Sequence, residues 1–101
     1  MKFNKVTVNP VQVYAVSAQS RYGVDSIDKT YVAANEKVVV TIGNDVTGTD
    51  WTGCTQANIS VDNGFTATKA VPAKDGSSIK VTLQAPAGIK GDVELTLDYQ
   101  P

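Results

Sequence analysis

Residue types that commonly carry catalytic chemistry are sparse in this sequence. The 101 residues include no histidine and a single cysteine, Cys54. Without histidine, the Ser-His-Asp and Cys-His arrangements of hydrolases and the usual zinc ligand sets cannot form. We interpret Cys54, which lies near Trp51, as a small buried or half-buried side chain, with a reactive thiol as the minor alternative. The sequence therefore predicts that the protein is not an enzyme and binds no cofactor.

The acidic residues that come closest to a metal site lie in a polar loop over residues 43–55. Asp45 and Asp50 occur there together with Asn44 and several threonines, and oxygen ligands of this kind suit Ca²⁺. Their spacing differs from that of a calcium-binding loop, and aspartate and asparagine are also common turn residues. We therefore interpret these residues as turn formers and predict no metal site.

Charge and hydropathy argue against nucleic-acid and membrane partners. Nine basic and ten acidic residues give a formal net charge of −1, which provides no field to attract a polyanion. The longest apolar runs, such as residues 38–40, fall far short of the roughly 18 residues of a membrane-spanning helix. Residues 1–5 do not resemble a secretion signal, and a lone cysteine fits folding in a reducing cytoplasm.

Alternating apolar and polar residues predict strands along most of the chain. A period of two is typical of antiparallel strands with one buried face. Such runs occupy residues 5–8, 11–16, 27–33, 37–42, 59–61, 65–67, 79–83 and 93–99. About eight short strands with turn residues between most of them, and no long amphipathic helix, predict an antiparallel β-sandwich.

Turns and loops divide these strands. Asn63-Gly64 predicts a type I′ hairpin, and Asp75-Gly76 predicts a second turn of this kind. Residues 17–28 have no clear period and are interpreted as a long polar loop, while the three valines at residues 38–40 indicate a central strand. The residues expected to be buried are Val13, Val38, Val40, Ile59, Val81, Leu83, Leu95 and Leu97.

Aromatic and arginine side chains outside the strands are candidate contacts for a protein partner, since these types anchor many interfaces. Arg21 and Tyr22 in the first polar loop are the better candidates. For Trp51 a core or loop-filling role is favoured over contact. Tyr14 and Asp45 complete the set of predicted contact residues. Tyr31 and Tyr99 are expected to cap the ends of the sandwich, with buried rings and solvated hydroxyls.

The order of features from Lys37 onward resembles an immunoglobulin-like domain of the IPT/TIG kind. The resemblance rests on residues 37–43, 59–64, 79–83 and 86–97, about the last two thirds of the chain, although Asn44-Asp45-Val46 replaces the usual aromatic after the first glycine. It implies a single immunoglobulin-like antiparallel sandwich of about seven to eight strands over residues 1–101. Residues 29–101 would form the core, and residues 1–28 a possible docking arm and loop.

A lone domain of this size also resembles the small immunoglobulin-like proteins of tailed-phage particles. The resemblance implies a structural virion protein, most simply a head decoration protein that stabilises the capsid. Its partner would be the major capsid protein or another virion structural protein, with homo-oligomers possible and assembly in the host cytoplasm. The alternative is a carbohydrate- or host-surface-binding module of a phage tail, a fibre or a bacterial adhesin, which requires Trp51 and Tyr22 to be exposed at one end of the sandwich.

Overall fold

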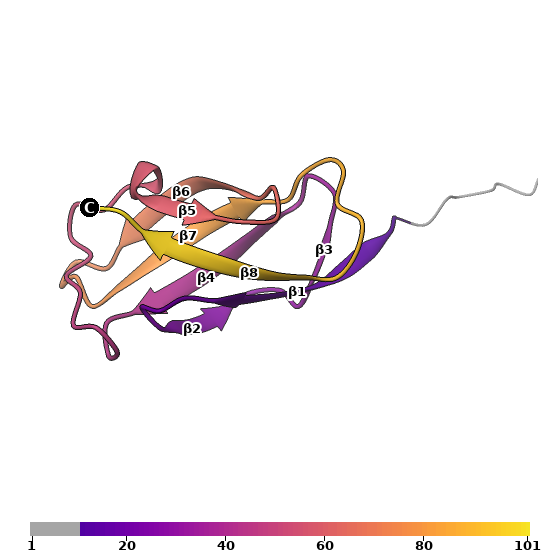
Figure 1. The fold of residues 1–101 in the computed structure, drawn as a ribbon. Coiled ribbons are helices and arrows are strands. Elements are labelled where there is room, and N and C mark those ends of the chain that lie inside the picture. Colours follow the sequence, from indigo (N-terminus) through magenta and orange to yellow (C-terminus); the bar gives the residue numbers. More distant parts are fainter. Residues whose placement is uncertain (1–10) are drawn as a thin grey trace, which may run out of the picture.

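The structure, a computed structural model, describes residues 11–101. The strand predicted at residues 5–8 lies outside the described residues. Within them the chain forms eight strands and one short 3₁₀ helix, so the prediction of an all-β protein is confirmed (Figure 1). The elements are β1 (Val13–Gln19), β2 (Val24–Ile27), β3 (Tyr31–Ala33), β4 (Lys37–Gly43), η1 (Gln56–Asn58), β5 (Ile59–Val61), β6 (Thr66–Pro72), β7 (Ser78–Gln84) and β8 (Val93–Tyr99).

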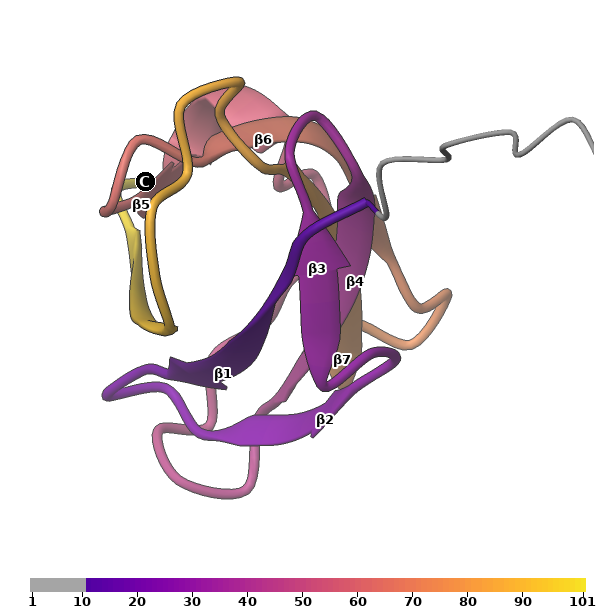
Figure 2. The ribbon, with the colours of Figure 1, turned by 90° about the vertical axis from the view of Figure 1, so that its right-hand side faces the viewer.

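The strands form two four-stranded sheets, as the predicted β-sandwich requires. One sheet has the order β3-β1-β8-β5 and the other the order β2-β4-β7-β6. Viewed along the molecule, the strands surround a common interior (Figure 2). β4 lies between β2 and β7, which confirms the central strand predicted from its three valines. Val38 and Val40 are fully buried and Val39 is half-buried.

The first described strand changes partner along its length. Over Val13–Ala15, β1 pairs antiparallel with β3, and from Val16 to Gln19 it pairs parallel with β8. All other pairs are antiparallel. The prediction of a wholly antiparallel sandwich is therefore wrong for β1 and β8. Alternation within a strand reports which face is buried but not the direction of its neighbour, so this pairing left no local signal.

Seven of the eight residues predicted to be buried lie in the core. Val38, Val40, Ile59, Val81, Leu83, Leu95 and Leu97 are each at most 7% exposed. Val13 is 54% exposed, so its predicted burial is wrong. The register of β1 explains the error, because Tyr14 faces the fully buried Val32 and Val16 enters the core. Val13 thus points to the solvent side of the sheet.

The polar loop predicted over residues 17–28 is mostly strand. β1 continues to Gln19 and β2 begins at Val24, which leaves only a short turn around Gly23, whose φ is +93°. Ser17 and Gln19 lie on the exposed face of β1, and a bulge after Val24 interrupts the alternation in β2. Because of these two features, the segment lacks the regular alternation that predicts a strand. In the strand predicted over residues 27–33, only β3 and the last residue of β2 are in strand conformation.

The Asn63-Gly64 turn forms but does not make a hairpin. Both residues have positive φ, +58° and +75°, as a type I′ turn requires. The turn joins β5 to β6, which belong to different sheets, so the predicted hairpin is wrong. By contrast, the turn at Asp75-Gly76 joins the paired strands β6 and β7. A tight turn fixes a change of direction, whereas the pairing of the strands that follow depends on the core.

Side chains of the same turn extend the hydrogen bonding of β8. The pairing of β5 with β8 ends at Val61, opposite Leu97. Beyond that point, Asp62 Oδ1 accepts a hydrogen bond from the Thr96 backbone N–H at 2.9 Å. Asn63 Nδ2 donates to the Glu94 carbonyl at 3.0 Å. Two backbone groups of β8 are therefore satisfied by side chains on the part of its edge that β5 does not cover.

Candidate functional site

Three aromatic rings pack together at the end of the sandwich where β8 finishes. Tyr22 comes from the β1–β2 turn, Trp51 from the loop after β4, and Tyr99 from the end of β8. Their ring centroids lie 5.0 to 5.8 Å apart, and all three pairs are edge-to-face with interplanar angles of 63° to 78°. This is the preferred geometry of aromatic pairs, so the rings join three distant segments of the chain.

Trp51 is a core residue. Its side chain is fully buried, and its indole Nε1 donates to the Gly43 carbonyl at 3.0 Å. Its backbone N–H donates to the Gly76 carbonyl, also at 3.0 Å. Trp51 therefore cannot contact a partner directly, which corrects its inclusion among the contact residues and agrees with the favoured interpretation of a core or loop-filling side chain.

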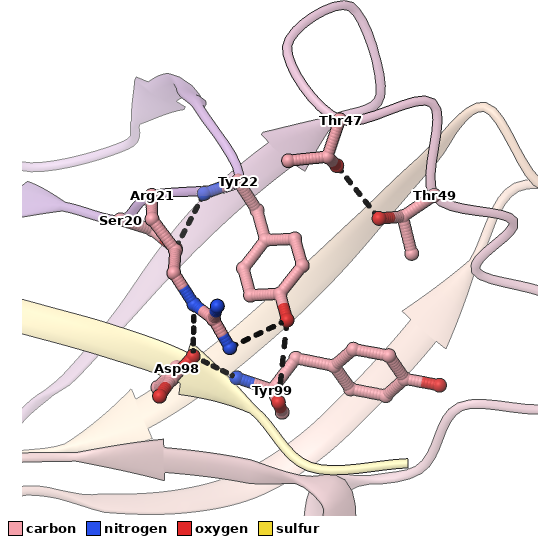
Figure 3. Close-up of polar contacts among 7 residues, drawn as sticks. All are labelled: Ser20, Arg21, Tyr22, Thr47, Thr49, Asp98 and Tyr99. Carbon is pink, nitrogen blue, oxygen red and sulfur yellow. Dashed lines mark hydrogen bonds and ion pairs between the residues drawn. The ribbon is translucent and has the colours of Figure 1, made fainter.

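Arg21 and Asp98 form an ion pair beside these rings (Figure 3). Arg21 Nε donates to Asp98 Oδ1 at 3.0 Å, and an Arg21 terminal nitrogen donates to the Tyr22 hydroxyl at 3.0 Å. The guanidinium carbon also lies 4.8 Å from the centre of the Tyr22 ring. The Tyr22 hydroxyl in turn donates to the Tyr99 carbonyl at 3.4 Å. We call Arg21, Tyr22, Trp51, Asp98 and Tyr99 the aromatic end.

The charges of this ion pair are favoured by their surroundings. The pKa of Asp98 is lowered, first by the hydrogen bond from the Tyr99 backbone N–H and then by Arg21. The pKa of Arg21 is raised by its hydrogen bond to Asp98. The two side chains are 69% and 46% exposed, so the pair presents a cation of fixed orientation to the solvent. Exposed pairs of this kind add little to stability, and the hydrogen bond to Asp98 fixes the position of Arg21.

The long loop after β4 provides no assembled metal site. Asp50 Oδ1 accepts a hydrogen bond from the Thr52 backbone N–H at 3.0 Å, which lowers the pKa of the Asp50 carboxyl. Asp45 is exposed in the same loop, where the Thr47 and Thr49 hydroxyl oxygens lie 2.6 Å apart (Figure 3). Within residues 11–101, no group of three histidine, cysteine, aspartate or glutamate side chains is placed to hold a metal ion.

Cys54, in this same loop, has the buried environment that its sequence context indicated. Its side chain is 5% exposed, and burial raises the pKa of its thiol. A buried thiol with a raised pKa is held in the protonated, unreactive form.

The opposite end of the sandwich exposes apolar side chains. Val11, Val13 and Tyr31 are 76%, 54% and 59% exposed. Val13 and Tyr31 lie diagonally across the β1–β3 pair, because Val13 faces Ala33 and Ala15 faces Tyr31. We call Val11, Val13 and Tyr31 the N-terminal patch. The expectation that the Tyr31 ring is buried is wrong, since the ring stands on the solvent face.

The predicted contact residues are divided between the two ends. Arg21 and Tyr22 lie together at the aromatic end, whereas Tyr14 lies on β1 near the N-terminal patch and donates from its hydroxyl to Gln12 Oε1 at 2.9 Å. The patch itself was missed because the strand register assigned Val13 to the core. The outward alternation of Val11 and Val13 is the signal that a correct register would have used.

A shallow groove of ≈ 350 Å³ lies between β1 and β8, beside the N-terminal patch. Its lining residues are Ala15, Val16, Ser17, Asp92, Val93 and Glu94. Pairing between the two strands begins only at Val16 and Val93, and just before that point Asp92 Oδ1 accepts a hydrogen bond from the Ala15 backbone N–H at 2.9 Å. The lining of the groove therefore includes three apolar residues and two carboxylates.

These arrangements offer contact chemistry of two kinds. The aromatic end holds an oriented cation, and the opposite end combines apolar and acidic surface. Among residues 11–101, no helix has the length and apolar content needed to cross a membrane. Comparison of the chain with protein-family models, with curated proteins and with solved structures gave no match.

Proposed function

We propose that this chain is a non-enzymatic structural protein of a virus particle, a head decoration protein that stabilises the capsid of a tailed phage. The observation that carries the proposal is the N-terminal patch, where Val11, Val13 and Tyr31 are each more than half exposed. Val13 and Tyr31 are diagonal neighbours on the exposed face of the β1–β3 pair, and neighbouring exposed apolar side chains are a feature of protein–protein contact surfaces. In this role the patch docks on the major capsid protein or on another virion structural protein.

We further propose that the sandwich is immunoglobulin-like. In immunoglobulin domains, the strands called B, E and D are neighbours in one sheet, and C and F are neighbours in the other. The order β4-β7-β6, together with the pair β5-β8, matches this arrangement in both chain order and pairing. The departure is β1, which lies parallel to β8 where an immunoglobulin domain has an antiparallel last strand. Five of the eight described strands therefore follow the immunoglobulin order, which supports the proposal.

The docking arm of this proposal is shorter than residues 1–28. β1 and β2 belong to the two sheets, and Val16 is in the core, so residues 13–27 form part of the sandwich. The arm is therefore confined to the residues before Val13, next to the N-terminal patch. Many copies bound by modest contacts would be retained through symmetry and avidity without a deep pocket.

The alternative function, binding to carbohydrate or to a host surface, has less support. It requires Trp51 and Tyr22 to be exposed together, and Trp51 is fully buried while Tyr22 is half-buried. The two side chains do lie at the same end, but as packing partners with ring centroids 5.4 Å apart. Glycan binding is therefore the less supported function, and the experiment below can distinguish it from docking on a particle.

The proposal can be tested by imaging virus particles from the native source of the protein. The attachment of two variants to these particles is then measured. Val13→Asp combined with Tyr31→Asp places charge in the N-terminal patch. Val71→Asp, at a residue 49% exposed on β6, is the matched control. We expect symmetric density for the protein on the particle, loss of attachment for the double variant and normal attachment for the control, with all three proteins folded by circular dichroism.

Two results would overturn the proposal. One is the absence of the protein from any particle, and the other is unchanged attachment of the folded double variant. Binding of the free protein to a glycan array, together with its absence from particles, would favour the alternative function. Full attachment after deletion of residues 1–10 would show that the arm is not needed for docking, but it would not contradict docking through the N-terminal patch.

A further inference from the structure

We propose that the groove between β1 and β8 receives residues 1–10 of a second copy of this chain. The inference deepens the proposed function, on which its docking arm rests, because it names the neighbouring subunit that the arm contacts. It concerns association between copies, so it can fail while the virion role stands. Three observations carry it: an open strand edge, complementary charge and the direction of β1.

The open edge lies on the side of β1 that faces the groove. β3 covers one side of β1 over Val13–Ala15, but β8 begins to pair on the other side only at Val16. The Ala15 N–H points to that second side, where it meets the Asp92 side chain in place of a strand. Backbone groups two residues apart on a strand point the same way, so those of Val13 also face this side. An extended segment can add to the sheet at Val13, next to the Ala15 N–H that Asp92 already binds.

Charge divides the chain between its first ten residues and the rest. Residues 1–10 contain Lys2 and Lys5 and no acidic residue, a formal charge of +2. Residues 11–101 contain all ten acidic residues and seven of the nine basic ones, a formal charge of −3. Two of those acidic side chains, Asp92 and Glu94, line the groove.

The apolar residues of the segment also suit the site. Val6 and Val8 alternate with Lys5 and Thr7, the period of a strand with one apolar face. The residues that line the groove include the buried Val16 and the half-buried Val93, and the N-terminal patch lies next to it along β1. An added strand would thus place apolar side chains on apolar surface and lysines near carboxylates.

The direction of β1 favours a second copy over the same chain. Residues 1–10 precede Val11, whereas the groove lies further along β1, so a segment of the same chain has to reverse its direction before β1 begins, next to Pro10, to enter it. Tight two-residue hairpin turns need positive φ, and proline holds φ near −65°. A segment from another molecule has no such constraint. Because the segment and the groove share one end, two copies can exchange segments reciprocally around a twofold axis.

The first experiment measures self-association of the full chain by sedimentation equilibrium. We expect a dimer whose dissociation constant rises about tenfold or more in the segment variant Lys2→Glu with Lys5→Glu, and similarly in the groove variant Asp92→Asn with Glu94→Lys. The Asp92→Asn change keeps a side-chain oxygen that can accept the hydrogen bond from the Ala15 N–H. An equimolar mixture of the two variants restores association, since the opposite charges then lie on different chains. Lys69→Glu, a charge change at an exposed residue of β6, leaves the dimer unchanged.

The second experiment identifies which chain fills the groove. A nitroxide on Asn4→Cys of an unlabelled chain is mixed with ¹⁵N-labelled chain, and the buried Cys54 thiol is protected from the reagent. We expect the nitroxide to broaden the amide signals of Ala15, Ser17 and Glu94 in the labelled partner.

A monomer at all concentrations, or an association that both charge variants leave unchanged, would overturn the inference. Broadening only when the nitroxide and ¹⁵N share a chain would overturn it too, by placing the segment in its own groove. If the charge variants lose the dimer yet attach normally to virus particles, contact between copies is established and the particle is reached by another surface. If the dimer is lost from neither variant while particles still bind the protein, only this inference fails.

Discussion

The two ends of the sandwich differ in surface and packing, although the same two strands, β1 and β8, run to both of them. At the aromatic end, Tyr22, Trp51 and Tyr99 join three segments, and Arg21 and Asp98 close the surface with an ion pair. At the other end, apolar side chains are exposed and β1 separates from β8 beside a groove. The ring cluster and the ion pair thus lie at one end of the fold, and the N-terminal patch and the groove lie at the other.

The same register relates β1 and β8 at both ends of the sandwich. A constant separation of 77 residues relates the paired strands, and it persists beyond the ladder in the Arg21–Asp98 and Tyr22–Tyr99 hydrogen bonds. At the opposite end the same separation appears in the bond from Ala15 to Asp92, where a side chain replaces backbone. Beyond the ladder, one end of the pair thus carries the Arg21–Asp98 and Tyr22–Tyr99 hydrogen bonds together with ring stacking, whereas the other carries the hydrogen bond from Ala15 to Asp92.

Truncation of Trp51 is expected to have the largest effect and tests whether the aromatic end holds the fold together. Trp51→Ala removes a fully buried ring and the hydrogen bond to Gly43, so we expect a loss of about 3–5 kcal/mol in the free energy of unfolding. Val13→Ala at the other end should cost less than about 1 kcal/mol. Guanidinium denaturation followed by far-ultraviolet circular dichroism measures both. Similar losses at the two sites would break the comparison.

Two glycine substitutions sharpen the comparison with a smaller effect. Gly76 has φ +73°, and an added Cβ would overlap the Asp50 carboxylate and lie 2.8 Å from Thr52 Oγ1. We expect Gly76→Ala to cost about 1–3 kcal/mol, because alanine disfavours this conformation and the Gly76 carbonyl positions Trp51. Gly88→Ala, in the loop before β8, adds a Cβ that meets nothing within 4 Å and should change stability by less than about 1 kcal/mol. Thermal melts of both variants would show a large difference; equal melting temperatures would contradict the role given to Gly76.

Acid should weaken the aromatic end through Asp98, with the smallest effect of the three. Because the folded-state pKa of Asp98 is lowered, its contribution is present above the unfolded pKa and is lost as pH falls through the folded value. We expect stability to decrease as pH falls below about 4, and this dependence to flatten in Asp98→Asn. Arg21→Ala should flatten it less, since the Tyr99 N–H is the larger cause. Denaturation midpoints measured at a series of pH values test the order of the two variants, and an equal slope in Asp98→Asn and the wild type would exclude Asp98 as the source.

The class of fold was accessible from the sequence because buried strands leave a regular trace. In β4 and β7 every second residue is buried, and the period-two pattern identified those positions. The same reasoning failed for β1, where Val13 and Val16 are both apolar and only one of them enters the core. A run with apolar residues of both parities fixes a strand but not its register.

Long-range pairing was less accessible, because it depends on which surfaces meet. The Asn63-Gly64 turn was predicted from residue type, but nothing local showed that it would bridge two sheets. The parallel pairing of β1 with β8 joins residues 77 positions apart, beyond any local pattern. Arg21 and Tyr22 lie together because they are adjacent in the sequence, whereas the positions of Tyr14 and Asp45 relative to them depend on the fold.

The parallel pairing of the first and last described strands also determines how the domain responds to tension. β1 and β8 run in the same direction, so the start of β1 and the finish of β8 lie at opposite ends of their ladder. A pull applied between these two points slides the strands lengthwise past each other. Backbone hydrogen bonds lie across that direction and must break together, along with the Arg21–Asp98 contact, instead of opening one after another. We therefore expect this ladder, when it is loaded in shear, to resist extension more strongly than the same bonds would if they were loaded one at a time.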